Sequence, residues 1–222
     1  MGNEADGVLF EVPLIASLLH RVYAHHPMQS LCVFCGANVG RDPLFAGAAR
    51  ELGHLLAAKN ITLIFGGASV GLMGAVADAT LDGGGRAIGV IPLALRDREL
   101  AHERLTELHV VETMHERKQR MYDLSDAFVA LPGGVGTLDE FFEVLTWNQL
   151  GLQTKPCGLL NVQNYFAQLI AFLNHVADQQ FLHATNRAHI RAATTPSDLL
   201  DQLATAHTNT DWILPHTIET RD

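Results

Sequence analysis

Residues 126–140 read Asp-Ala-Phe-Val-Ala-Leu-Pro-Gly-Gly-Val-Gly-Thr-Leu-Asp-Glu. An apolar run leads directly into a turn that is dense in glycine, and a helical pattern follows with Thr137 as its predicted N-cap. Open α/β sheets build anion sites from a strand, a glycine-rich turn and a helix in this order, because main-chain N–H groups can approach a ligand there. The stretch therefore predicts a phosphate site.

Apolar runs alternate with amphipathic stretches along the rest of the chain. Three runs end in glycine turns, at Gly36, Gly66 and Gly133. The ligand crevice of an open α/β sheet lies at such carboxyl ends of strands. We therefore expect an α/β fold with a Rossmann-like, doubly wound, mostly parallel sheet, and a nucleotide-sized pocket where the three turns converge. The expected strands are 30–36, 61–65, 86–92, 108–112, 126–131, 156–162 and 189–193; the expected helices are 42–59, 71–82, 114–124, 137 onward, 164–177 and 197–204, the last with Ser197 as N-cap.

The chain is expected to form a single domain, because no repeat and no linker rich in Pro, Gly or Ser divides it. Residues 1–28 form an extension, in which apolar residues of 11–25 fall at helical spacing and predict an amphipathic helix. The nucleotide-binding domain spans 29–205, and 206–222 form a weakly patterned tail.

Composition limits the classes of partner. The chain has 222 residues and a formal charge of −9, which argues against a nucleic acid polymer because backbone binding needs a basic face. Three cysteines are too few for a disulfide framework. With no signal peptide and no long apolar span, we expect a cytoplasmic protein with no membrane partner.

Metals and cofactors are not indicated. Cys32-x-x-Cys35 lies on an apolar strand, where residues three apart point to opposite faces, so we expect two buried, inert thiols. The twelve histidines show no metal-ligand spacing on a helix. Neither G-x-G-x-x-G nor G-x-x-x-x-G-K-[ST] follows the glycine turns, so we expect no redox dinucleotide and no other cofactor.

The charged residues near the turn each allow two interpretations. Thr137-x-x-Glu140 has the spacing of a capping box, in which the glutamate only returns to the N-cap amide. Glu140 also lies where a ligand would approach. Arg117 and Lys118 have the pattern of solvent-facing cations, yet cations early in a helix oppose its dipole, which favours an anion nearby.

Two motifs carry a resemblance to a known family. Met-His-Glu-Arg-Lys at 114–118, followed by 132–140, resembles the paired signature of the LONELY GUY (LOG) family. Members of that family are cytokinin riboside 5′-monophosphate phosphoribohydrolases, long mislabelled as lysine decarboxylases. The resemblance extends from about Leu31 to Leu203 and includes Gly-Gly-Ala-Ser-Val-Gly-Leu-Met-Gly at 66–74 and Thr-Trp-Asn-Gln-Leu-Gly at 146–151.

The resemblance implies a homodimer that hydrolyses the N-glycosidic bond of a nucleoside 5′-monophosphate, either a cytokinin nucleotide or AMP. The products are the free base and ribose 5-phosphate. Arg117 and Glu140 match the catalytic pair of the family. The residues expected to bind phosphate or substrate are Gly133, Gly134, Val135, Gly136, Thr137, Lys118, Glu99 and Thr146, with Gly36, Gly67 and Ser69 from the earlier glycine turns.

The residue types fit this chemistry. Glycosidic cleavage passes through an oxocarbenium-like ribose, which a carboxylate such as Glu140 stabilises while it orients a water. Arg117 is always charged and therefore acts as an electrostatic clamp. A pyridoxal enzyme would need a Schiff-base lysine, and Lys59, Lys118 and Lys155 are poorly placed for one. The alternative is a protein of the molybdenum-cofactor-carrier type, which binds a nucleotide or cofactor phosphate without cleaving it.

Overall fold

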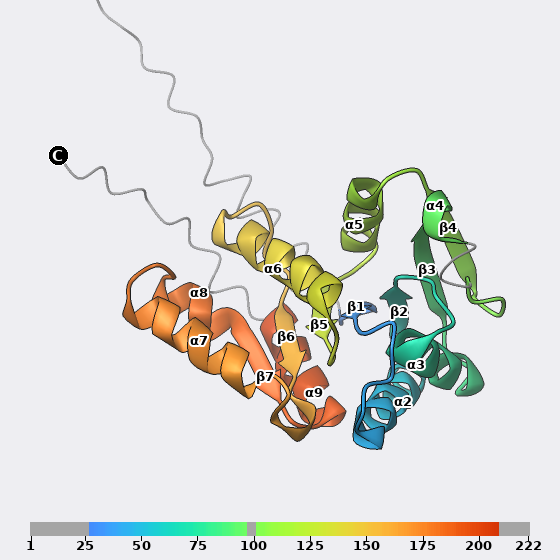
Figure 1. The fold of residues 1–222 in the computed structure, drawn as a ribbon, viewed down its shortest axis with the longest axis horizontal. Helices are drawn as coiled ribbons and strands as arrows, with labels where there is room; N and C mark the ends of the chain where they lie inside the picture. Colours follow the sequence, from blue (N-terminus) through green and yellow to red (C-terminus); the bar gives the residue numbers. More distant parts are fainter. Residues whose placement is uncertain (1–26, 97–100, 209–222) are drawn as a thin grey trace, which may run out of the picture.

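The computed structural model describes residues 27–96 and 101–208. In these residues seven strands form one parallel sheet in the order β4-β3-β2-β1-β5-β6-β7 (Figure 1). The expected doubly wound sheet is therefore confirmed. The predicted helix within 11–25, Glu99 and the chain after residue 208 lie outside the described residues. The elements are β1 (Ser30–Phe34), α2 (Pro43–Ala58), β2 (Thr62–Phe65), α3 (Gly71–Asp82), β3 (Ala87–Pro92), α4 (Leu93–Arg96), β4 (Glu107–Val111), α5 (Met114–Asp123), β5 (Ala127–Ala130), α6 (Val135–Gln149), β6 (Cys157–Leu160), the 3₁₀ helix η1 (Val162–Asn164), α7 (Ala167–Asp178), α8 (Ala184–His189), β7 (Ile190–Ala193) and α9 (Pro196–Thr208).

The order of the strands places a topological switch between β1 and β5. The chain winds outward from β1 to β4 and then returns to pair β5 with β1, where Phe34 lies opposite Ala130. The connections that follow β1 and β5 therefore run in opposite directions along the sheet. This leaves a crevice at the carboxyl ends of the two strands. This is where an open α/β sheet holds its ligand.

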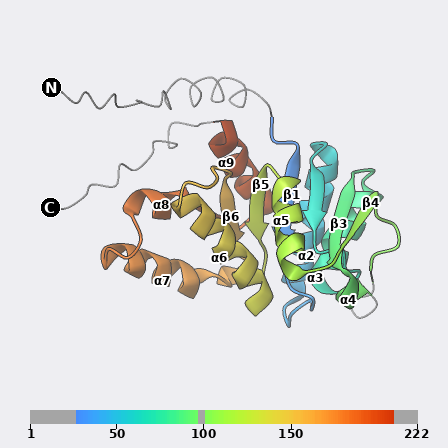
Figure 2. The same ribbon diagram turned by 90° about the horizontal axis from the view of Figure 1, so that it is seen from above.

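Helices cover both faces of the sheet (Figures 1 and 2). Alternate side chains of β1 enter the two cores: Leu31 and Val33 pack with α2, α3 and α9, whereas Cys32 and Phe34 pack with α5, α6 and α7. Coverage on both faces explains why the central strands are nearly continuous apolar runs.

Several helix boundaries differ from the expected ones. The side chain of Thr195 accepts a hydrogen bond from the Asp198 N–H at 3.3 Å, so the helix begins at Pro196 and Ser197 is not its cap. It continues to Thr208, beyond the expected end at 204. α7 begins at Ala167 instead of 164, because Gln163 and Asn164 have φ values of 50° and 58° and interrupt the helix.

The cysteines lie as expected. Cys32 and Cys35 belong to the cores on opposite faces of the sheet, and both are buried free thiols, as is Cys157. Within the described residues there is no group of three or more His, Cys, Asp or Glu side chains that could hold a metal ion. No helix in the same part of the chain has the length and apolar character needed to cross a membrane.

Two glycines of α2 test how closely the helices pack. A Cβ on Gly53 would lie 2.5 Å from the Val76 carbonyl oxygen of α3, whereas a Cβ on Gly47 would meet no atom within 4 Å. We expect Gly53→Ala to lower the free energy of unfolding by about 1–3 kcal/mol through overpacking. Gly47→Ala should raise it by about 0.5–1 kcal/mol, because alanine loses less backbone entropy in a helix. Urea unfolding of both variants checks this; equal effects would contradict the packing.

Candidate functional site

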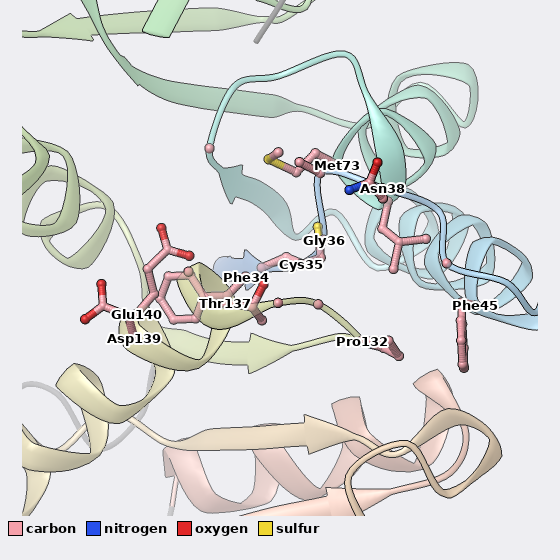
Figure 3. Close-up of a pocket in the computed structure, with 18 of the residues that line it drawn as sticks. Phe34, Cys35, Gly36, Asn38, Phe45, Met73, Pro132, Thr137, Asp139 and Glu140 are labelled. Carbon is pink, nitrogen blue, oxygen red and sulfur yellow. The ribbon is translucent and has the colours of Figure 1, made fainter. Parts of the chain in front are cut away.

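A cavity of about 500 Å³ opens at the carboxyl ends of β1, β2 and β5 (Figure 3). Its walls include the loop 35–40 after β1, Gly66 after β2, and the loop after β5 from Pro132 to the start of α6. The expected convergence of the three glycine turns is therefore confirmed. The volume is in the range of small-molecule sites.

The N-terminus of α6 faces this cavity without a capping side chain. The N-cap is Gly134, so the expectation that Thr137 caps the helix is wrong, and Thr137–Glu140 is not a capping box. The capping box occurs instead at α5, between Thr113 and Glu116. Because Gly134 has no side chain to offer, the first-turn N–H groups of α6 are left to interact with a ligand.

The glycines of this loop serve two different purposes. A Cβ on Gly133 would lie 2.2 Å from the Thr137 hydroxyl oxygen and 2.9 Å from the Gly36 nitrogen, so Gly133 is required for packing. A Cβ on Gly134 or Gly136 would meet no atom within 4 Å. Both residues line the cavity, so the absence of their side chains leaves room for a ligand near the backbone.

Tyr165, which follows β6 in the chain, contacts the same loop. Its hydroxyl donates a hydrogen bond of 2.7 Å to the Gly133 carbonyl, and its ring meets Phe45 edge-on at 5.6 Å. Both aromatic residues line the cavity, and neither was expected there from the sequence. The sequence feature that could have indicated Tyr165 is Asn164 directly before it. Asn tolerates a left-handed backbone, and both Gln163 and Asn164 have positive φ, so the chain turns immediately before Tyr165.

Arg117 is buried in the wall of the cavity, with 6% of its surface exposed. Its Nη2 donates to the Gly66 carbonyl at 3.3 Å, and its Nη1 lies 3.9 Å from the Met114 sulfur. Its Nε is buried and has no hydrogen-bond partner in the described part of the chain. The interpretation of Arg117 as a solvent-facing cation is therefore wrong, and its buried donors suit an anion.

Glu140 lines the cavity from α6, so the structure brings Arg117 and Glu140 to one site. Figure 3 shows Glu140 beside Phe34, near the end of β1. Burial raises the pKa of Cys35, which also lines the cavity, and the charge of Glu140 raises it further. This thiol is therefore protonated and not a nucleophile.

The structure gathers only some of the expected site residues. Lys118 does not line the cavity: its Nζ lies 2.8 Å from Asp139 and 3.1 Å from Glu143. The Thr146 hydroxyl donates to the Phe142 carbonyl, and Thr146 borders a different hollow between α6, α7 and α8. The expected residues in the cavity wall are Gly36, Arg117, Gly133, Gly134, Gly136, Thr137 and Glu140, whereas Gly67, Ser69, Lys118, Val135 and Thr146 lie outside it.

Sequence relatives decide the family. A family model described as "Possible lysine decarboxylase" matches residues 73–203. A Rhodococcoides fascians protein named cytokinin riboside 5′-monophosphate phosphoribohydrolase is 49% identical over 73% of this chain and 82% of its own length. The chain belongs to the LOG family. Within this family, a rice (Oryza sativa subsp. japonica) protein with the same name, marked as probable and called LOGL6, is 42% identical over 96% of this chain and 82% of its own length.

Solved structures share the LOG family fold at low sequence identity. The molybdenum cofactor binding protein of Rippkaea orientalis gives a TM-score of 0.60 at 22% identity, over 82% of this chain and 97% of its own. The Moco carrier protein of Chlamydomonas reinhardtii gives 0.62 at 19% identity, over 83% and 99%. At these identities the likeness concerns the fold alone.

The lysines of this LOG family member do not fit the decarboxylase description of the family model. Lys59 pairs with Asp201 on the surface, Lys118 with Asp139 and Glu143, and the Lys155 Nζ donates to the Tyr122 carbonyl at 2.8 Å. None of the three lines the cavity. A Schiff base with pyridoxal therefore has no lysine at this site.

The thiols provide a test of the cavity's chemistry. Burial raises the pKa of Cys157 to about 12 and holds those of Cys32 and Cys35 well above the ordinary range. We expect thiol reagents to label the native protein slowly at pH 7 and still slowly at pH 9, where an ordinary thiol is mostly ionised. Labelling should become fast only in denaturing urea. Rapid labelling of Cys35 in native protein, located by peptide mass spectrometry, would show an activated nucleophile.

Proposed function

We propose that this protein hydrolyses the N-glycosidic bond of cytokinin riboside 5′-monophosphates and releases the free base and ribose 5-phosphate. The observation that carries the proposal is that one cavity is lined by the uncapped start of α6, the buried Arg117 and the carboxylate of Glu140. The names of its relatives, whose length the chain largely covers, support the substrate class.

The 5′-phosphate is assigned to the loop 133–137. Helix N-termini attract anions because their N–H groups are unsatisfied and the helix dipole is positive there. The open positions at Gly134 and Gly136 let phosphate oxygens approach the backbone closely. Binding at the phosphate then positions the sugar for reaction.

The ribose is assigned to the neighbourhood of Glu140. As the C1′–N9 bond breaks, its electron pair leaves with the base and positive charge develops on the ribose. The carboxylate stabilises that charge and accepts a proton from the water whose oxygen forms the new bond to C1′. The departing base gains negative charge, which Arg117 stabilises until N9 takes up a proton.

The alternative is a protein that binds a nucleotide or cofactor phosphate without cleaving it. The solved structures of molybdenum cofactor binding and carrier proteins support this alternative through their fold alone. Glu140 argues against it, because a carboxylate in the cavity weakens the binding of an anion but stabilises the positive charge that develops during cleavage. The hydrolase is therefore the better explanation of the site.

Three finer points belong to the same proposal. AMP is a second substrate, because an unsubstituted adenine occupies less of the cavity than a cytokinin base.

The protein is a homodimer. The exposed side chains of Phe142, Phe172 and Phe181 support this state, and light scattering tests it. It is cytoplasmic, since its three free thiols suit a reducing compartment.

Substrate comparison tests the reaction. Incubation with AMP and with isopentenyladenosine monophosphate should release free base, detected by chromatography. We expect kcat/KM for adenosine to be roughly a hundred-fold or more below that for AMP, because the nucleoside lacks the phosphate that positions it. Comparable turnover of adenosine and AMP would contradict the assigned phosphate site, and release of no base from any monophosphate would favour the alternative.

Replacement of the carboxylate tests its role. We expect Glu140→Gln to lower kcat by about 10²–10⁴-fold, the range for loss of a general base. Because Glu140 does not cap α6, loss of a helix cap would not account for this decrease, and the urea midpoint of the variant shows how much of it is due to stability. Glu51→Gln, on the exposed side of α2, is the matched control and should keep full turnover. A Glu140→Gln variant with normal turnover would remove the carboxylate from the mechanism.

A further inference from the structure

Lys118 stands next to Arg117 in the chain but projects in another direction. Consecutive helix residues point about 100° apart, so Arg117 turns into the cavity while Lys118 turns toward α6. The Lys118 ammonium lies between the carboxylates of Asp139 and Glu143, at 2.8 and 3.1 Å, and its side chain is 18% exposed. Burial alone would lower the pKa of Lys118, but hydrogen bonds to Asp139 and Glu143 raise it above its ordinary value.

The two carboxylates bracket Glu140 on α6. Asp139 precedes it directly, and Glu143 lies one helical turn after Asp139. Lys118, Glu140 and Glu143 also border one void of about 10 Å³, which is room for a single water at most. Glu140 therefore lies between the ligand cavity and the ion pairs of Lys118.

These ion pairs join helices that rest on different parts of the sheet. α5 packs on β3 and β4, whereas α6 packs on β5 and β1 (Figure 1). One turn further along, Tyr122 of α5 meets Trp147 of α6 edge-on at 5.0 Å. We call Lys118, Tyr122, Asp139, Glu143 and Trp147 the α5–α6 contact. It spans the boundary between the two halves of the sheet, with Arg117 on one side and Glu140 on the other.

We propose that Lys118 is a positioning residue: its ion pairs with Asp139 and Glu143 hold α5 against α6 and so set the separation between Arg117 and Glu140. The inference rests on the proposed function, in which these two residues act on opposite sides of one glycosidic bond. It replaces the expectation that Lys118 contacts the substrate. A shift of about 1 Å between reacting groups is enough to lower turnover a hundred-fold.

Glu143 makes the proposal testable, because it does not line the ligand cavity. Glu143→Gln therefore removes one of the two ion pairs without removing a group from the cavity wall, and the double variant with Lys118→Met shows whether its effect acts through Lys118. Asp139 is less useful, since it lines the cavity itself. The aromatic pair Tyr122–Trp147 and the buried Met121, Phe141 and Val144 remain in every variant and keep the helices folded on the sheet.

The experiment measures kcat and KM for AMP in Lys118→Met, Glu143→Gln, the double variant and Lys118→Arg. We expect Lys118→Met to lower kcat about 10- to 100-fold while KM changes less than about two-fold. Glu143→Gln should lower kcat by a smaller factor, the double variant should match Lys118→Met, and Lys118→Arg should restore most of the turnover. Lys59→Met, which removes a surface ion pair elsewhere, should behave as wild type. Tm should stay within a few degrees throughout.

A binding measurement separates positioning from direct contact. In a Glu140→Gln background, which should consume the nucleotide far more slowly, the Kd for AMP by calorimetry should be the same with Lys118 and with Met at that position. A ten-fold rise in Kd or KM with unchanged kcat would overturn the proposal and make Lys118 a ligand of the substrate. Unchanged kcat and KM in Lys118→Met would also overturn it. If the wild type releases no base, the proposed function fails first, and the positioning role fails with it.

Discussion

The buried guanidinium of Arg117 is the constraint on which the cavity depends. A charged group taken out of water is costly unless hydrogen bonds compensate it, and this guanidinium donates to the Gly66 carbonyl and lies against the Met114 sulfur. Gly66 makes this placement feasible, because a Cβ there would lie 2.1 Å from Nη2. A side chain at the position directly after β2 would displace the guanidinium from its place in the cavity wall.

The two halves of the sheet contribute different kinds of chemistry to this site. The half that carries α5 supplies a fixed positive charge. The half that carries α6 supplies backbone amides at an uncapped terminus, together with the carboxylate of Glu140. A nucleoside monophosphate has a matching order of groups: an anionic phosphate, a ribose that becomes positive, and a base that becomes negative. Placing the site at the switch between β1 and β5 lets one small ligand meet all of these groups.

The fold was predictable from sequence because apolar runs, helical periodicity and glycine turns are local signals. The site was predictable only in part. Thr137 and Glu140 have the spacing of a capping box, but Gly134 takes the cap position and leaves no side-chain pattern to reveal it. The burial of Arg117 depends on Gly66, which lies 51 residues away. The direction of Lys118 depends on the packing of α5 against α6, which no local pattern specifies.

The hydrogen bond from Tyr165 has a consequence for the main chain of the anion loop. The peptide unit that joins Gly133 to Gly134 is planar, so its carbonyl and its N–H point in opposite directions. Two successive glycines restrict the rotation of this unit less than residues with side chains would. A peptide flip would break the hydrogen bond to the tyrosine hydroxyl, so a residue that follows β6 favours one direction of the Gly134 amide dipole.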